Sequence, residues 1–189
     1  MISSISQLVF EKNWKTRGHI RIDQKEYKIA TFTEEDKIFY ILGRLINFED
    51  PSETNPRLAV VFKIELHSIA DLGFNLGYKN LYNVFGVAVE KSMQGLGIAK
   101  TMYKFIVNVT HINILGDKNQ YFGARRLWAK MSKDLDVVVD IVDVKKKIVL
   151  DQGVELYHGR HDHDFDQRVW SYSRDKENIR LVMRSIAKN

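Results

Sequence analysis

Apolar and polar residues alternate along the first half of the chain in the manner of strands. LAVVFKIELHS (58–68) ends with apolar residues separated by Lys63, Glu65 and His67, as in a strand with one buried face. Upstream, HIRIDQKEYKIATF and KIFYILGRLIN are rich in β-branched and aromatic residues, and NVFGVAV (83–89) is a further apolar run. The glycine-spaced ADLGFNLGYKN before that run predicts a loop. We therefore expect the first half to be mostly sheet.

The pattern changes to a helical period after Gly97. Apolar residues then recur at the spacing of one helix face, at Ile98, Met102, Phe105, Ile106 and Val109. A similar stripe predicts a second helix from Asn119, with Ala124, Leu127, Trp128 and Met131 on its apolar side. VVVDIVDV (137–144) and KIVL (147–150) predict strands around a lysine turn, whereas IRLVMRSI (179–186) fits either a helix or a buried strand.

The composition narrows the classes of protein and of site. A chain of 189 residues argues for a single domain over 1–189, and the absence of cysteine excludes disulfides, zinc–thiolate sites and cysteine nucleophiles. No apolar run approaches the ~20 residues of a membrane span, so we expect a cytoplasmic protein with no membrane partner. The net charge of +5 suits an anionic ligand, but the mixed signs along the chain do not establish nucleic-acid binding.

The turn EKSMQGLGIAK (90–100) joins the apolar run ending at Val89 to the first predicted helix. A P-loop is excluded because Ala99, rather than glycine, precedes Lys100. A dinucleotide-binding GxGxxG is excluded because Lys100 stands where the third glycine is needed. The pattern QxxGxA, from Gln94 to Ala99, fits this strand-to-helix turn.

This turn resembles the signature of the GNAT (Gcn5-related N-acetyltransferase) superfamily, which lies between a strand and a helix. A later block, GDKNQYFGARRLWAKM, is similar to the family's segment with an Asn and an AxxxY pattern. The resemblance covers roughly residues 58–131. It implies an α+β fold with a mixed, mostly antiparallel central sheet flanked by helices, here with a strand-rich N-terminal half. It also implies a last strand beside the fifth, which favours a strand over 179–186.

The cofactor implied by the resemblance is acetyl-CoA. Small residues in the turn would let backbone amides approach its diphosphate at a helix N-terminus, and the strand edge would pair with its pantetheine amides. The residues expected to bind it are Val87, Ala88, Val89, Gln94, Gly95, Leu96, Gly97, Ile98, Ala99 and Asn119. The alternatives are an ordinary strand-to-helix turn for the glycines and helix capping for Asn119.

The implied activity is N-acetyl transfer to a primary amine, such as a protein lysine, by direct attack. The match fails at two positions, because Trp128 replaces the family's acidic Tyr and Asn83 replaces its basic Glu. Tyr121 is the substitute candidate for the acid, with a packed aromatic as the alternative. For the base the candidates are Glu65, His67 or a water relay, and the alternative for His67 is a purely structural role.

A His/Asp-rich run, HGRHDHDFD (158–166), lies where the resemblance places the border of the acceptor site. Its spacing matches no established metal-ligand pattern, so we expect no metal there. Its carboxylates, Asp162, Asp164 and Asp166, are predicted to attract a cationic amine, with a solvated loop as the alternative. Residues 20–68 show no helix pair of the kind that walls the family's acceptor pocket, which favours a macromolecular acceptor.

Two other functions stay open at this point. The first is a catalytically degenerate GNAT-fold protein that acts by binding or inhibition, which Asn83 and Trp128 favour. The second is a nucleic-acid-directed modifying enzyme, suggested by a basic helix face with Arg125, Arg126, Lys130 and Lys133. A solvated helix surface would explain those cations equally. The sequence does not predict the oligomeric state.

Overall fold

The fold is α+β, with mostly antiparallel strands. The computed structural model describes residues 5–6, 14–46, 57–117, 120–158, 165–170 and 177–186. The chain divides into two compact units, the first holding residues 1–67 and 85–99 and the second holding residues 68–84 and 100–189. Each unit is continuous in space but not in sequence, and the expectation of one domain over 1–189 stays a prediction.

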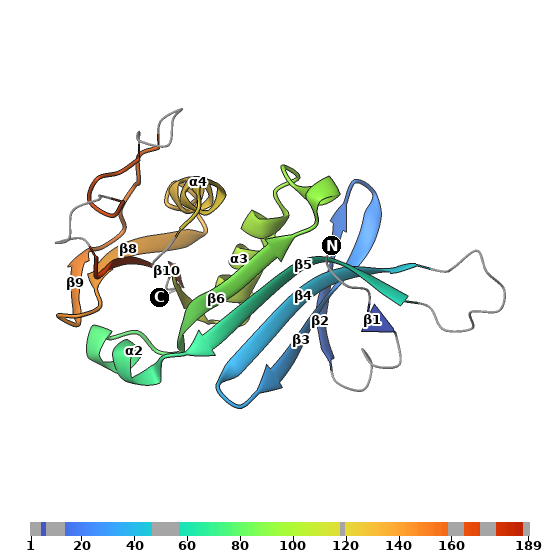
Figure 1. The fold of residues 1–189 in the computed structure, drawn as a ribbon, viewed down its shortest axis with the longest axis horizontal. Coiled ribbons are helices and arrows are strands. Elements are labelled where there is room, and N and C mark those ends of the chain that lie inside the picture. Colours follow the sequence, from blue (N-terminus) through green and yellow to red (C-terminus); the bar gives the residue numbers. More distant parts are fainter. Residues whose placement is uncertain are drawn as a thin grey trace. The chain divides into compact units, whose positions relative to one another are not determined.

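Four long strands form an antiparallel meander in the first unit. They are β2 (Lys15–Ile22), β3 (Lys25–Glu34), β4 (Lys37–Ile46) and β5 (Arg57–Ser68), shown in blue to teal in Figure 1. The short β1 (Ile5–Ser6) pairs with the start of β5. Asp23 and Gln24 turn β2 into β3 with φ of 47° and 63°, values that suit a tight hairpin. The strands predicted in this region are confirmed.

Strand β6 (Leu81–Val89) begins in the second unit and ends in the first. Its last part lies beside β5, since the Glu90 amide donates to the Val61 carbonyl at 2.8 Å and the Phe85 ring stacks on His67. These two contacts run in opposite order along the strands, so the pairing is antiparallel.

The second unit carries its own run of strands, in the order β6, β7, β10, β8, β9. The later strands are β7 (Asn113–Leu115), β8 (Val137–Asp143), β9 (Ile148–Asp151) and β10 (Ile179–Ser185). Only the β6–β7 pair among those described is parallel, and the other ladders are antiparallel. The strand interpretation of 179–186 is confirmed, because β10 lies between β7 and β8.

The helices are α2 (Ala70–Leu76), the short 3₁₀ helix η1 (Lys91–Met93), α3 (Ile98–Val109) and α4 (Phe122–Met131). Figure 1 shows α2 beside β9 and α4 against β8. The predicted loop over ADLGFNLGYKN is wrong, because its first part forms α2. That helix ends at Gly77 in the left-handed region, and Leu76 packs in a core cluster with Leu81 and Val182. Packing therefore overrides the weak helix propensity of the segment.

Each unit has a buried apolar interior. In the first, Phe62, Ile64 and Leu66 on β5 have no exposed surface, and a second cluster joins Ala30, Ile41, Leu58 and Val60. Trp14 packs against that second cluster. None of the helices in the described residues has both the length and the apolar character needed to cross a membrane.

Candidate functional site

The glycine turn lies in the first unit, between the end of β6 at Val89 and the start of α3 at Ile98. Gly95 and Gly97 have φ of +85° and +76°, which side-chain-bearing residues rarely adopt. A Cβ at either glycine would meet no atom within 4 Å, so both positions border open space. Ile98 is buried and fixes the start of α3, whereas Leu96 is 45% exposed. The turn thus presents backbone at the surface beside a helix N-terminus.

Gln94 closes the base of this turn. Its Nε2 donates to the Val89 carbonyl at 3.3 Å, and its backbone N–H donates to the Lys91 carbonyl at 3.3 Å. The side chain therefore holds the end of the strand and leaves the glycines beyond it to face outward. The amides of Ile98 and Ala99 follow at the first turn of α3, where N–H groups have no partner within the helix.

The last part of β6 extends beyond its ladder with β7. β7 pairs with Leu81–Asn83, whereas β6 continues to Val89. Val87 is 44% exposed and Ala88 is exposed as well. This segment, β5 and the glycine turn belong to the first unit, so the structure brings together the predicted strand and turn parts of the cofactor site.

Glu65 and His67 form a hydrogen-bonded pair on β5. His67 Nε2 lies 2.7 Å from Glu65 Oε1, and their side chains are 24% and 22% exposed. The imidazole stacks on Phe85, with ring centroids 4.4 Å apart and planes 6° from parallel. A proton on Nε2 that is donated to Glu65 leaves Nδ1 as a lone-pair acceptor. Sequence analysis named both residues as separate candidates but did not predict that they pair.

The side chains at the two positions where the GNAT pattern fails, Asn83 and Trp128, are engaged in hydrogen bonding and core packing. Asn83 donates its side-chain amide to the Val84 carbonyl. Trp128 is 2% exposed and meets the ring of buried Tyr103 edge to face, with centroids 6.3 Å apart. An indole in this position serves the core of the second unit.

Tyr121 lies in the second unit, immediately before α4. The sequence predicts a helix from Asn119 that would include Tyr121, but α4 begins at Phe122 and Tyr121 is its N-cap residue. Its carbonyl accepts from the amides of Ala124 and Arg125, and its side chain is 87% exposed. That exposure is incompatible with the packed-aromatic alternative.

Asn119, a predicted cofactor-binding residue, lies outside the described residues. Its neighbour Gln120 is a buried polar residue. Gln120 is 8% exposed, and its Oε1 is buried without a hydrogen-bond donor in the described part of the chain. Sequence analysis missed this residue, because the helix was predicted to begin at Asn119 and the burial of Gln120 depends on tertiary packing.

Of the three predicted acceptor carboxylates, Asp162 and Asp164 lie outside the described residues. Asp166 is 6% exposed and accepts a 2.7 Å hydrogen bond from Arg168 Nη2 and another from the Tyr157 amide. Burial alone would raise the pKa of this carboxyl, but the Arg168 hydrogen bonds outweigh it and lower the pKa. Asp166 therefore stabilises its loop by hydrogen bonds to Arg168 and Tyr157. A carboxylate that is buried and paired in this way is poorly placed to attract an external amine. No group of three metal-ligating side chains occurs among the described residues.

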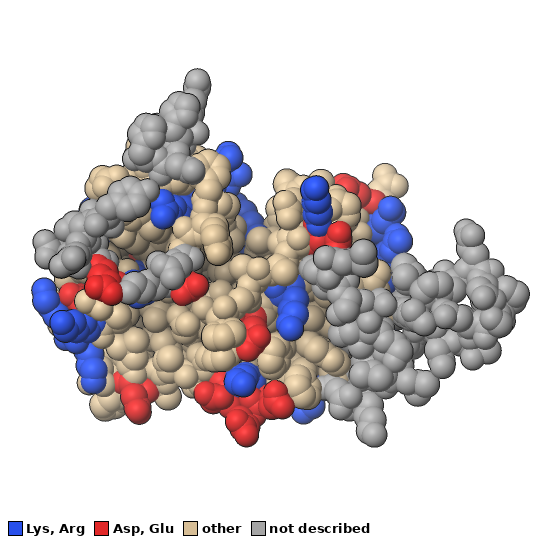
Figure 2. Space-filling model, in the orientation of Figure 1, with Lys and Arg blue, Asp and Glu red and all other residues tan. Residues whose placement is uncertain are grey.

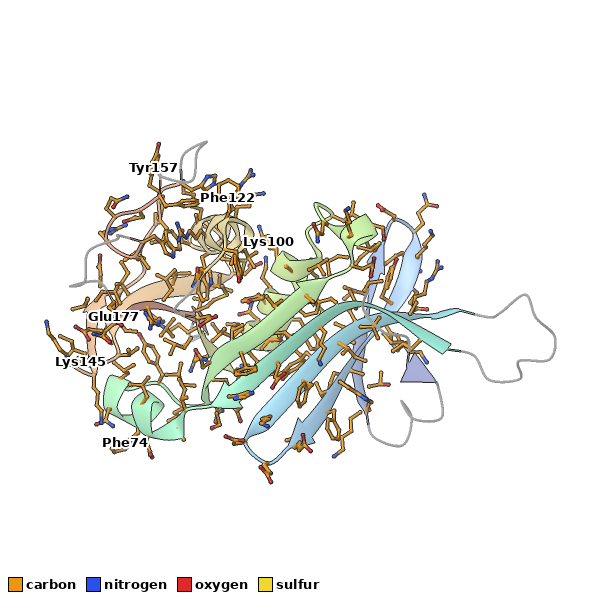
Figure 3. The ribbon with its side chains drawn as sticks, in the orientation of Figure 1. Phe74, Lys100, Phe122, Lys145, Tyr157 and Glu177 are labelled. Atoms are coloured by element: carbon orange, nitrogen blue, oxygen red, sulfur yellow. The ribbon has the colours of Figure 1, made fainter. Side chains whose placement is uncertain are left out.

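The basic face of α4 is partly used in packing. The Arg125 guanidinium lies 5.5 Å from the centroid of Phe165, and that of Arg126 lies 5.4 Å from the centroid of Phe122, which Figure 3 labels on this helix. Lys130 is exposed on the helix, whereas Lys133 is exposed beyond its end at Met131, so the predicted basic helix face does not include Lys133. Figure 2 shows both Lys and Arg and Asp and Glu side chains at the surface of the described residues.

The chain was compared with protein-family models, curated proteins and solved structures, and none of them matches it.

Proposed function

We propose that the chain is an acetyl-CoA-dependent N-acetyltransferase with a GNAT-like fold. The observation that supports it most is the glycine turn, where Gly95 and Gly97 expose backbone between a strand end and the N-terminus of α3. A diphosphate suits such a turn because helix N-termini carry partial positive charge and unpaired N–H donors. The β6 segment beyond the β7 ladder gives a pantetheine arm a backbone to pair with.

When bound, acetyl-CoA supplies an activated acyl thioester. The Glu65–His67 pair is suited to accept the proton of the attacking amine, since the carboxylate orients the imidazole. The Val89 N–H is the candidate donor to the developing oxyanion, as the family resemblance implies. The amine nitrogen bonds to the acyl carbon, the carbon–sulfur bond breaks, and the departing thiolate takes a proton. Tyr121 is exposed but belongs to the second unit, so that proton is assigned to solvent.

Calorimetric titration with coenzyme A tests the turn directly. We expect Gly97→Ala to weaken coenzyme A binding at least about tenfold, because a methyl group would occupy the space over the turn and strain the backbone. Gly77→Ala is the matched control, since Gly77 has φ of +78° and the same open surroundings but ends α2. Both changes carry the same backbone strain, so their difference isolates the role of the turn.

The proposal fails if the unmodified protein does not bind coenzyme A, or if the two glycine variants weaken binding equally. Binding that is insensitive to salt would also count against it, since contacts to a diphosphate are electrostatic.

A binding protein without catalysis is the second candidate. Asn83 and buried Trp128 at the usual base and acid positions favour it. Release of coenzyme A thiol in the presence of amines separates the two candidates. An enzyme releases thiol with each acyl transfer, and His67→Ala should then slow release with little effect on coenzyme A binding. A pure binding protein retains the cofactor without releasing thiol.

A further inference from the structure

One face of the first unit's sheet carries half-buried and exposed aromatic and charged side chains in a contiguous group. We call it the aromatic face and define it by Phe39, Lys63, Glu65, His67, Phe85 and Val87. Phe39 lies opposite Glu65 in the β4–β5 register, and Lys63 Nζ lies 5.3 Å from the Phe39 ring centroid. The His67–Phe85 stack continues the face onto β6.

The aromatic face is anchored at one end and open at the other. Its Phe39 ring stacks 6.0 Å from Phe32, whose ring is 5.6 Å from Trp14, and Trp14 packs on a buried cluster. At the opposite end Phe85 is 66% exposed and Val87 is 44% exposed. Large exposed apolar side chains with a polar rim mark interaction surfaces, and rings already held by their neighbours lose little freedom on binding.

The charges on this face distinguish between classes of partner. Lys37 and Lys63 stand among Glu34 and Glu65 on the same side of the sheet, so the signs are balanced. A phosphate backbone needs a surface of mostly positive charge, which this is not. A polypeptide, with apolar side chains and both signs of charge, suits it better. Among the described residues Glu65 forms an ion pair with an imidazole and not with Lys or Arg, so its carboxylate is suited to attract a further cation.

We propose that the aromatic face docks a lysine-bearing polypeptide segment, with an apolar side chain on Phe85 and Val87 and the lysine ammonium at Glu65. The docking depends on this surface alone, whereas acyl transfer to the docked lysine rests on the proposed function. In that transfer the docked ammonium first releases one proton to solvent. The neutral nitrogen then bonds to the acyl carbon and gives its second proton to His67, while the carbon–sulfur bond breaks and the coenzyme A thiolate takes a proton from solvent.

Fluorescence anisotropy of a labelled peptide tests the docking. The probe is an extended peptide of alternating leucine and threonine with one central lysine. We expect Phe85→Ser to weaken its binding about tenfold, because the aromatic side chain that the docked peptide would bury is lost. Phe74→Ser is the matched control, since Phe74 projects from α2 in Figure 3 and is 86% exposed, yet lies in the other unit. Glu65→Gln should weaken binding of the lysine peptide but not of the same peptide with leucine at the centre.

The proposal is overturned if the peptide does not bind, if the two phenylalanine variants weaken it equally, or if a single-stranded oligonucleotide displaces it from the unmodified protein. Thermal melting checks that each variant folds. If Phe85→Ser does not fold, Val87→Thr replaces it in the anisotropy measurement and should also weaken peptide binding. Calorimetry with coenzyme A keeps the two proposals apart. If the peptide binds in a Phe85-dependent way but the protein does not bind coenzyme A, the proposed function is refuted and the proposed docking surface is retained.

Discussion

Asp140 shows how single residues hold the second unit together. This carboxylate has no exposed surface, yet it accepts hydrogen bonds from Arg184 Nε at 2.6 Å, the Tyr78 hydroxyl at 2.8 Å and the Gly153 amide at 2.9 Å. Burial and the bond to Asp140 raise the pKa of Tyr78, so its phenol stays a donor. A buried charge is tolerated here because each of its oxygens has donors.

Removing one donor should therefore be costly. We expect Arg184→Met to lower the free energy of unfolding by about 3–5 kcal/mol, because Asp140 would stay buried without its cation. Arg180→Met, on the same strand, is the control. Arg180 donates to the Glu177 and Ile179 carbonyls, and burial lowers the pKa of its guanidinium, so its loss should cost far less. Urea unfolding of the two variants measures the difference, and equal losses would contradict the assignment.

At the scale of elements, two helical glycines with opposite surroundings give a paired test. A Cβ on Gly73 would lie 2.7 Å from the Tyr78 carbonyl oxygen and 2.8 Å from Leu81 Cβ, whereas one on Gly123 would meet nothing within 4 Å. Gly→Ala in a helix ordinarily stabilises by up to about 1 kcal/mol. We expect that gain for Gly123→Ala in α4, and a loss for Gly73→Ala because α2 must move away from its neighbours.

Circular dichroism melting distinguishes these outcomes. The melting temperature should rise for Gly123→Ala and fall for Gly73→Ala. A rise for both would mean that α2 is not held against the Tyr78 loop by close packing.

Elements with a strong hydrophobic period were the ones that the sequence predicted well. The alternation in β5 and the stripe of α3 gave both type and extent, because one side of each element is buried. α2 was missed because glycines in a short segment predict a loop, and only the tertiary cluster around Leu76 shows that they allow close packing. The site follows the same division. The glycine turn is a local feature and was predictable, whereas the pairing of Glu65 with His67 and the burial of Asp166 depend on neighbours.

For the whole molecule, the division into two units had no signal in the sequence. The chain changes unit before the last residue of β5, within β6 after Val84 and within α3 after Ala99, so regular structure runs through all three points. A search for boundaries relies on linker composition, such as proline, glycine or charge runs. A strand and a helix that each serve two units carry none of these features.

Acid should destabilise the molecule through its second unit. Among the described residues the carboxyl groups with a lowered pKa are Asp134 and Asp166, both in that unit. Burial opposes ionisation of Asp134, but hydrogen bonds from Lys100 at 2.6 Å and Lys104 at 3.0 Å outweigh it and lower its pKa to about 2. A carboxyl whose pKa is lower in the folded than in the unfolded state contributes stability above its unfolded pKa. That contribution is lost as the pH falls from about 4 to about 2.

Asp134→Asn should therefore cost about 2 kcal/mol at neutral pH, since the lysines lose their charged partner. Most of that cost should be gone near pH ~2, where the native carboxyl is about half protonated. Asp136→Asn is the control, because Asp136 also pairs with Lys104 but is 61% exposed, and solvent-screened pairs contribute little. Urea unfolding across a pH series gives both curves. If the loss of unfolding free energy in Asp134→Asn is the same at every pH, the side chain acts through packing. Its charge would then not be what binds the start of α3 to the segment after α4.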